Sequence, residues 1–233
     1  MQEIRYAMVD GEKVPVLISD ENEALQAAKA ARRAIVGLWR EDGKENEWCA
    51  DTLITDVEDA DEEFLERIAR RHLGLPWTIC ETERLILREI AERDYEEIVK
   101  NHVDDGLDTA EKIAGYTKRH YEVFEFGFWA VEEKKSGNLA GVVGFRIPQD
   151  DAAGDVEDWL LSFDDENILD DTLELGYHIF PEYRRQGYAK EACLAAVEYA
   201  KEEFGTVQFL ARIEKDNIAS KKVAERLGFV RAA

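Results

Sequence analysis

The chain has 233 residues, of which 45% are apolar and 10% aromatic, so it can bury a core and is not intrinsically disordered. Its 52 acidic residues outnumber its 30 basic ones and give a formal net charge of -22, which argues against nucleic acid or an anionic membrane as a partner. An anionic ligand would need a local site built from backbone N–H groups and a few arginines.

The three cysteines, Cys49, Cys80 and Cys193, are far apart and form no CxxC motif or other metal-ligand spacing. We therefore expect reduced thiols, no metal site and a cytoplasmic protein. The first residues lack the basic start and apolar run of an export signal, and no run of 18 apolar residues occurs. The sequence thus predicts neither export nor membrane insertion.

Residues 1–78 alternate between strand-like and helix-like patterns, which favours a small α/β unit. Strands are predicted at 14–20, 34–41 and 51–56, and helices at 21–33 and 60–74. Asp20 and Glu23 have the spacing of a capping box at the first of these helices. The stretch GLPWTI, 74–79, carries the glycine and proline typical of a boundary, so we place the end of this unit near residue 78.

The second part of the chain begins with a strand and two helices and continues with a hairpin. These elements are predicted at 84–90, 91–103, 110–126 and 126–147, and a further strand is predicted at 172–180. An insert at 149–171 precedes that strand and has ten acidic residues but no lysine or arginine. Trp159, Leu160, Leu161 and Phe163 interrupt its acidic run, so we expect part of it to pack as a flap. Its charge either concentrates a cationic substrate or is simply solvated.

The stretch PEYRRQGYAKEA, 181–192, connects the last of these strands to a helix. Small and apolar residues then recur at steps of three and four from Ala189 to Phe204, as on one face of a helix. The N–H groups of residues 185–190 would have no partner within the helix, and Gly187 would let a ligand approach the backbone. Such a turn suits a pyrophosphate, although an ordinary solvated helix start has a similar composition.

Within this stretch, RRQGYA resembles the cofactor-binding signature of the GNAT N-acetyltransferase superfamily, with Arg184, Gly187 and Ala189 at the defining positions. Three stretches resemble, in order, the Rim-type branch, which includes ribosomal-protein N-terminal acetyltransferases. They are ETERLILRE at 81–89, LELGYHIFPEYRRQGYAKEA at 173–192 and NIASKKVAERLGFV at 217–230. The resemblance covers residues 79–233 and implies an α/β fold, with a GNAT-like mixed central sheet and flanking helices.

The resemblance also implies acetyl-CoA as cofactor, held between the splayed fourth and fifth strands of the family fold. It assigns the cofactor's arm to Tyr177, His178, Ile179 and Asn217. It assigns the phosphates to the turn formed by Arg184, Arg185, Gln186, Gly187, Tyr188, Ala189 and Lys190. Neither assignment follows from composition or spacing alone.

Acetyl transfer to an amine needs a base for the amine and an acid for the departing thiolate. Glu174 is the candidate base, and the alternative is an ordinary outward-facing strand residue. Many relatives carry a glutamate on the fifth strand where this chain has Arg212, and a tyrosine acid where it has Ala224. Ser220 resembles a serine that some Rim-type members place near the sulfur, although it could serve only as a helix cap.

Relatives normally continue past LGF through a further strand, and their last hairpin helps to form the acceptor pocket. We therefore expect this hairpin to be short or missing here, and the N-terminal unit or another subunit could complete it. The function that the sequence predicts is acetyl transfer to a primary amine of a small molecule, protein or peptide. The alternative is a catalytically inactive acyl-CoA-binding or regulatory module. For residues 1–78, the open roles are substrate selection, homodimer formation, partner binding and bracing of the catalytic unit.

Overall fold

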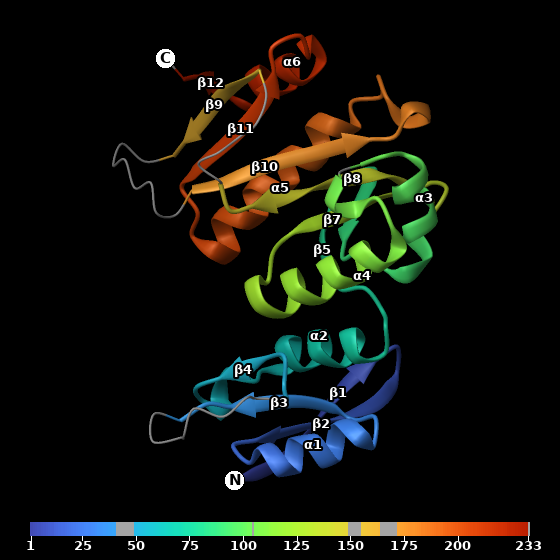
Figure 1. Ribbon diagram of the computed structural model, residues 1–233, viewed down its shortest axis with the longest axis vertical. Helices are drawn as coiled ribbons and strands as arrows, with labels where there is room; N and C mark the ends of the chain where they lie inside the picture. Colours follow the sequence, from blue (N-terminus) through green and yellow to red (C-terminus); the bar gives the residue numbers. More distant parts are fainter. Residues whose placement is uncertain (41–48, 104, 149–154, 164–171, 233) are drawn as a thin grey trace. The chain divides into compact units, whose positions relative to one another are not determined.

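The computed structural model describes residues 1–40, 49–103, 105–148, 155–163 and 172–232. The chain forms two compact units, Met1–Trp77 and Thr78–Ala233 (Figure 1). Each unit has its own sheet and its own buried apolar core.

The first unit is a four-stranded sheet with two helices. Its elements are β1 (Gln2–Val9), β2 (Glu12–Ser19), α1 (Asn22–Ala30), β3 (Ala34–Leu38), β4 (Leu53–Ile54), a 3₁₀ turn (Val57–Asp59) and α2 (Glu62–His72). The strand order is β1-β2-β3-β4; β1 and β2 are antiparallel, whereas β2, β3 and β4 run parallel. Strand β1 was not predicted, because it carries apolar residues on both of its faces: Ala7 and Val9 are buried, but Tyr6 and Met8 are exposed.

The predicted capping box at the first helix is wrong. Helix α1 follows Glu21, whose side chain makes no capping hydrogen bond. The Asp20 carboxylate instead pairs with the amino group of Met1 and with Arg40 Nε, at 2.7 Å in the second case. Two cations therefore hold this carboxylate and lower the pKa of Asp20, chiefly through its hydrogen bond with the amino terminus.

The second unit contains an eight-stranded mixed sheet. Its strands are β5 (Thr78–Glu81), β6 (Leu85–Arg88), β7 (Phe128–Glu133), β8 (Leu139–Arg146), β9 (Val156–Ser162), β10 (Thr172–Ile179), β11 (Gln208–Glu214) and β12 (Val230–Arg231). Their order is β12-β9-β11-β10-β8-β7-β6-β5. Neighbouring strands are antiparallel except for β10 and β11, which are parallel.

Helices cover both faces of this sheet. They are α3 (Tyr95–Lys100), α4 (Ala110–Arg119), α5 (Tyr188–Phe204) and α6 (Ile218–Leu227); 3₁₀ turns lie at Glu92–Asp94, Asp105–Leu107 and Pro181–Tyr183, and a π-helical turn at His120–Phe124. Ile98 of α3 and Ile113 of α4 pack on one face, whereas Ala192 and Ala196 of α5 pack on the other. The sheet is therefore the middle of three layers, and its two faces meet different helices.

The helix predicted at 91–103 is short and starts late. Asp94 is buried and accepts two hydrogen bonds from Arg88, at 2.6 and 2.8 Å, and one from the N–H of Ala91 at 2.8 Å. Because these bonds fix Asp94 in a 3₁₀ turn, the α-helical pattern begins only at Tyr95.

The acidic insert contributes a strand to the sheet and not a flap. β9 pairs with β11 along its whole length, from Val156 opposite Glu214 to Ser162 opposite Gln208. Trp159 is 7% exposed and belongs to the main core, and the two-residue strand β12 pairs with the other edge of β9. The insert thus provides the strand next to β11 at this edge of the sheet. Completion of the acceptor pocket by the first unit or by another subunit stays a prediction.

The acidic residues of the insert that the structure describes form ion pairs within the second unit. Glu157 binds Lys221 of α6 at 2.8 Å and Arg231 of β12 at 3.1 Å. Asp155 pairs with Lys215, and Asp158 lies 3.6 Å from Arg212. These carboxylates therefore contribute little net charge of their own, and the rest of the insert lies outside the described residues.

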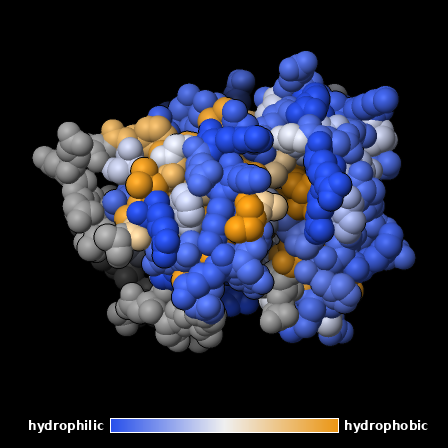
Figure 2. All heavy atoms as spheres, turned by 90° about the horizontal axis from the view of Figure 1, so that it is seen from above, coloured by the Kyte–Doolittle hydropathy of each residue, from blue (hydrophilic) through white to orange (hydrophobic). Residues whose placement is uncertain are grey.

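The face of the molecule in Figure 2 is largely hydrophilic, with hydrophobic residues in small separate patches. Among the described residues, no helix has the length and apolar character needed to cross a membrane. The three cysteines are free thiols, and burial raises the pKa of both Cys80 and Cys193, which keeps them protonated.

Candidate active site

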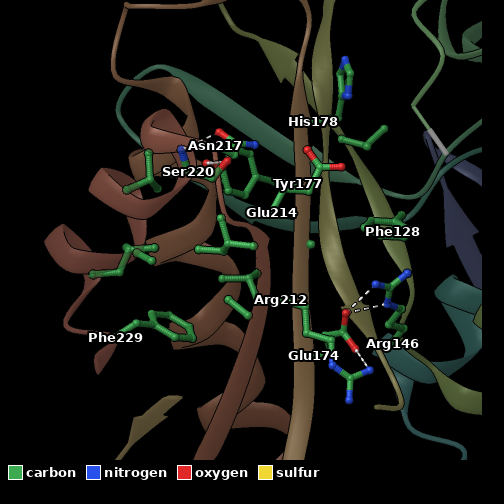
Figure 3. Close-up of a pocket in the computed structure, with 18 of the residues that line it drawn as sticks. Phe128, Arg146, Glu174, Tyr177, His178, Arg212, Glu214, Asn217, Ser220 and Phe229 are labelled. Atoms are coloured by element: carbon green, nitrogen blue, oxygen red, sulfur yellow. Dashed lines mark hydrogen bonds and ion pairs between the residues drawn. The ribbon is translucent and has the colours of Figure 1, made fainter. Parts of the chain in front are cut away.

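The site lies where the parallel strands β10 and β11 separate. They pair only at Thr172–Gln208, Leu173–Phe209 and Glu174–Leu210, although both strands continue for several residues. The gap opens a cavity of about 220 Å³ that is also bordered by β8 and α6 (Figure 3). The polar side chains that line it are Arg146, Glu174, Tyr177, His178, Arg212, Glu214, Asn217 and Ser220.

The cavity has two chemically different sides because successive strand residues point to opposite faces. Tyr177, with its neighbours Leu175 and Ile213, faces α5 and α6. Glu174 and Arg212 touch each other on the opposite face, the one that α3 and α4 cover. We call these the α6 side and the α3 side of the cavity.

An ion cluster around the buried carboxylate of Glu174 forms the end of the cavity where β10 and β11 still pair, on the α3 side. Glu174 is 2% exposed and accepts hydrogen bonds from two groups of Arg146, Nε at 2.9 Å and Nη2. Its other oxygen accepts from Arg212 Nη1 at 3.3 Å. Both oxygens of the predicted base are therefore engaged by guanidinium groups.

Glu214 is a second carboxylate in the cavity, and sequence reasoning missed it. It lies two residues beyond Arg212 on the same face of β11, toward the open end. Its side chain is exposed and makes no hydrogen bond or ion pair within the described parts of the chain. Its spacing of two residues from Arg212 could have placed Glu214 on the same face of the strand, but only the separation of β10 from β11 shows that this face borders a cavity.

A pair of hydroxyl groups lies on the α6 side. Tyr177 donates from its phenol to Ser220 Oγ at 3.1 Å, and Asn217 Oδ1 caps α6 by accepting from the N–H of Ser220 at 3.0 Å. Burial raises the pKa of Tyr177 to about 12, so its phenol is a proton donor at neutral pH. Figure 3 shows this pair at the end of the cavity away from the Arg146–Glu174–Arg212 cluster.

His178 also lines the cavity, on the α3 side near the end of β10. Burial and, to a smaller degree, the nearby Arg184 lower the pKa of His178, so the imidazole is neutral at pH 7. Arg184 folds back onto the strand, with Nε donating to the carbonyl of Ile179 at 2.8 Å. Ile179 itself is buried in the main core and not in the cavity.

The turn from β10 to α5 lies at the open end of β10. Gly187 precedes the helix with φ of +86°, and Arg185 has φ of +61°. The N–H groups of residues 185–190 have no backbone partner among the described residues. Gln186 and Lys190 are exposed on the turn, whereas Tyr188 is buried and Ala189 is half-buried. The turn thus presents free donors at the positive end of a 17-residue helix.

These features fit acetyl-CoA. The free N–H groups match a pyrophosphate, and the largely apolar wall of the α6 side matches an extended acyl arm. Glycine is required at position 187 by its φ of +86°, and no Cβ there covers the backbone N–H groups that follow. Of the residues predicted from the sequence, five line the cavity, the turn residues lie beyond the end of β10, and Ile179 lies in the core.

Comparisons with known proteins agree with this geometry. Residues 84–230 match the family model described as an acetyltransferase (GNAT) domain. The chain is 27% identical to the uncharacterized N-acetyltransferase YoaA of Bacillus subtilis, over 65% of this chain and 82% of that protein.

Two solved structures share the fold. A putative GNAT-family acetyltransferase from Bordetella pertussis has a TM-score of 0.51 at 20% identity, covering 66% of this chain and 89% of its own. A putative ribosomal-protein-serine acetyltransferase from Vibrio cholerae has a TM-score of 0.50 at 24% identity, covering 65% and 82%. The chain therefore belongs to the GNAT acetyltransferase family and is a GNAT-type N-acetyltransferase, a family whose acetyl donor is acetyl-CoA.

Proposed function

We propose that the second unit transfers the acetyl group of acetyl-CoA to a primary amine of a small molecule, protein or peptide by direct attack. The observation that carries this proposal is the separation of β10 from β11, with the unpaired N–H groups of the turn at its open end. The acetyl-CoA, when bound, supplies an activated thioester. The chain has to position it, remove a proton from the amine and supply one to the thiolate.

We assign cofactor binding to the turn and the α6 side. The N–H groups of residues 185–190 would bind the phosphates, and Tyr177 and Asn217 would line the acyl arm. Ile179 supports this wall from the core, and His178 would face the cofactor's arm from the α3 side of the cavity. In this assignment Arg184 holds the strand end, and does not contact the phosphates.

For the base we favour Glu214 over the sequence-based candidate Glu174. Glu214 Oε atoms are open to the cavity and can accept a proton from an amine, directly or through water. Glu174 is held by two arginines and is better suited to fixing their positions. The role of Glu174 as base stays a prediction that substitution can test.

For the acid we propose Ser220. Its Oγ accepts the proton of the Tyr177 hydroxyl, so its own proton is free to point into the cavity and reach a sulfur on the α6 side. This arrangement places two hydroxyl groups in the part of the site where Ala224 replaces the tyrosine expected from relatives.

We propose a cationic amine as acceptor. Glu214 is an open carboxylate in the cavity, and the net charge of -22 attracts cations to the protein. The first unit, residues 1–78, is a separate module whose proposed role is to select or dock the acceptor. Dimerisation through this unit is the alternative role.

The decisive experiment measures free CoA released from acetyl-CoA in the presence of peptides, polyamines, aminoglycosides or amino acids. Thiol release that depends on one class of amine, with mass spectrometry showing the acetylated product, would support the proposal. The second candidate function is an inactive acyl-CoA-binding module, which the engaged carboxylate of Glu174 and the alanine at position 224 favour. It is the correct one if calorimetry shows acetyl-CoA binding but no amine releases the thiol.

A further inference from the structure

The stretch ETERL, 81–85, lies against the turn that precedes α5, although about a hundred residues separate them in the sequence. Glu191, in the first turn of α5, accepts from Thr82 Oγ1 at 2.6 Å and from the N–H of Arg84 at 3.0 Å. Arg84 Nε donates to the second oxygen of Glu191 at 2.8 Å. Both carboxylate oxygens are thus held by the connection between β5 and β6. Burial alone would raise the pKa of Glu191, but the hydrogen bonds from Thr82 and Arg84 outweigh burial and lower it.

Arg84 also reaches the turn itself. Its Nη1 donates to the carbonyl of Gln186 at 2.9 Å, and its guanidinium lies 4.6 Å from the centre of the Tyr188 ring. Tyr188 in turn donates to Glu133 of β7 at 2.5 Å. One arginine side chain therefore connects the turn, the helix and the strands beside them.

The turn has a conformation that requires such support. Arg185 has φ of +61°, which residues other than glycine rarely adopt, and Gly187 has φ of +86°. The carbonyl that Arg84 binds belongs to Gln186, the residue between them. Fixing this carbonyl fixes the orientation of the following peptide groups, whose N–H groups form the anion site.

We propose that Arg84 is a positioning residue, which together with Thr82 and Glu191 holds the turn at 184–188 in its phosphate-binding shape before the cofactor arrives. This inference rests on the proposed function, because it takes the turn as the acetyl-CoA site. Arg84 acts through the backbone of the turn: its charge is already balanced by Glu191.

A direct contact between Arg84 and the cofactor phosphates is the competing explanation, and Glu191 distinguishes the two. If Arg84 contacted the phosphates, Glu191→Gln would free a cation for them and tighten binding. If Arg84 positions the turn, the same substitution removes one half of the support and weakens binding. Arg84→Lys also distinguishes the two explanations. Lysine keeps the positive charge that a direct phosphate contact needs, but it cannot bind Gln186 and Glu191 at once as the positioning role requires.

The test is isothermal titration of CoA into the full chain. We expect the Kd to rise about tenfold in Arg84→Lys and in Glu191→Gln, and the double variant to bind no more weakly than either single one, because each breaks the same unit. Thr82→Val, a smaller change, should raise the Kd severalfold and tests the inference if the other variants do not fold. Arg93→Lys is the matched control, since Arg93 is an exposed arginine paired with Glu132 at 3.3 Å and should leave the Kd unchanged.

A second measurement is the rate at saturating acetyl-CoA, which should stay within about twofold of the wild type, because positioning of the turn acts on binding. Tighter binding by Glu191→Gln, or wild-type affinity in Arg84→Lys and Thr82→Val, would overturn the inference. A wild-type chain that does not bind CoA at all would instead overturn the proposed function.

Discussion

Replacing Glu174 by glutamine separates the two candidate roles of this carboxylate. The change keeps the size of the side chain but removes the negative charge between Arg146 and Arg212. If Glu174 fixes the arginines, the main effect should be on stability. If Glu174 is the base, the main effect should be on kcat.

The expected loss of stability follows from burial. Breaking a buried ion pair costs roughly 3–5 kcal/mol. The value here should be lower, because the Arg146 side chain is 49% exposed and glutamine still offers one acceptor oxygen. We expect roughly 2–3 kcal/mol, which for a domain of this size lowers the Tm by roughly 4–12 °C.

Thermal unfolding followed by calorimetry and CoA release followed by a thiol reagent measure the two effects. Glu214→Gln should show the opposite pattern, with a change in stability below about 0.5 kcal/mol and a fall in kcat of about a hundredfold. Glu203→Gln, an exposed position on α5, is the matched control for both. A Glu174→Gln variant with the wild-type Tm and a strongly reduced kcat would refute the reasoning and make Glu174 the base.

Four further outcomes are expected. Gly187→Glu should abolish binding of acetyl-CoA in calorimetry, because it places bulk and negative charge at a position with φ of +86°; an unchanged Kd would remove the turn from the site. Ser220→Ala should lower kcat by about tenfold to a hundredfold with little change in Kd, and Tyr177→Phe less so; full activity in Ser220→Ala would place the acid elsewhere. Trp159→Ala should destabilise the second unit by about 3 kcal/mol, whereas Leu160→Ala, at a 38% exposed position of the same strand, should cost under about 1 kcal/mol; equal costs would contradict the packing of β9. Folding lowers the pKa of His178 from 6.5, so its contribution to stability is present above pH 6.5 and is lost as the pH falls through the lowered pKa of the folded protein. The wild type should therefore lose more stability below pH 6 than His178→Gln does, and identical pH curves for the two would show that His178 does not contribute.

The local parts of the site could be predicted from the sequence. The turn from β10 to α5 follows from Gly187 and from the apolar spacing that begins at Ala189, and both signals lie within a few residues of the feature they determine. Its support could not be predicted, since Arg84 in the β5–β6 connection and Gln186 in the turn are far apart in the sequence and meet only in the folded chain. For Glu174, the position on the strand could be predicted, but the two arginines around it could not. One of them, Arg146, comes from the neighbouring strand β8.

The insert shows why composition alone was misleading. Its acidic residues indicated either a field that concentrates a cationic substrate or a solvated segment. The structure instead pairs Asp155 with Lys215, and Glu157 with Lys221 and Arg231, all of which follow β11 in the sequence. The number of acidic residues in the sequence therefore overstated the negative electrostatic potential around β9. The apolar residues Trp159 and Leu161, two positions apart, were the better signal, since they match a strand that packs one face on a core.

The position of β9 also explains how the gap between β10 and β11 can exist. A strand that leaves its neighbour loses hydrogen bonds on that edge, which is costly if the other edge is also open. Strand β11 pairs with β9 along all of Gln208–Glu214, and β10 pairs with β8 from Glu174 to Ile179. Each strand therefore keeps one complete ladder while its inner edge stays open toward the cavity. The insert thus supports the site from behind β11, and the backbone groups that face the gap remain available to a bound ligand.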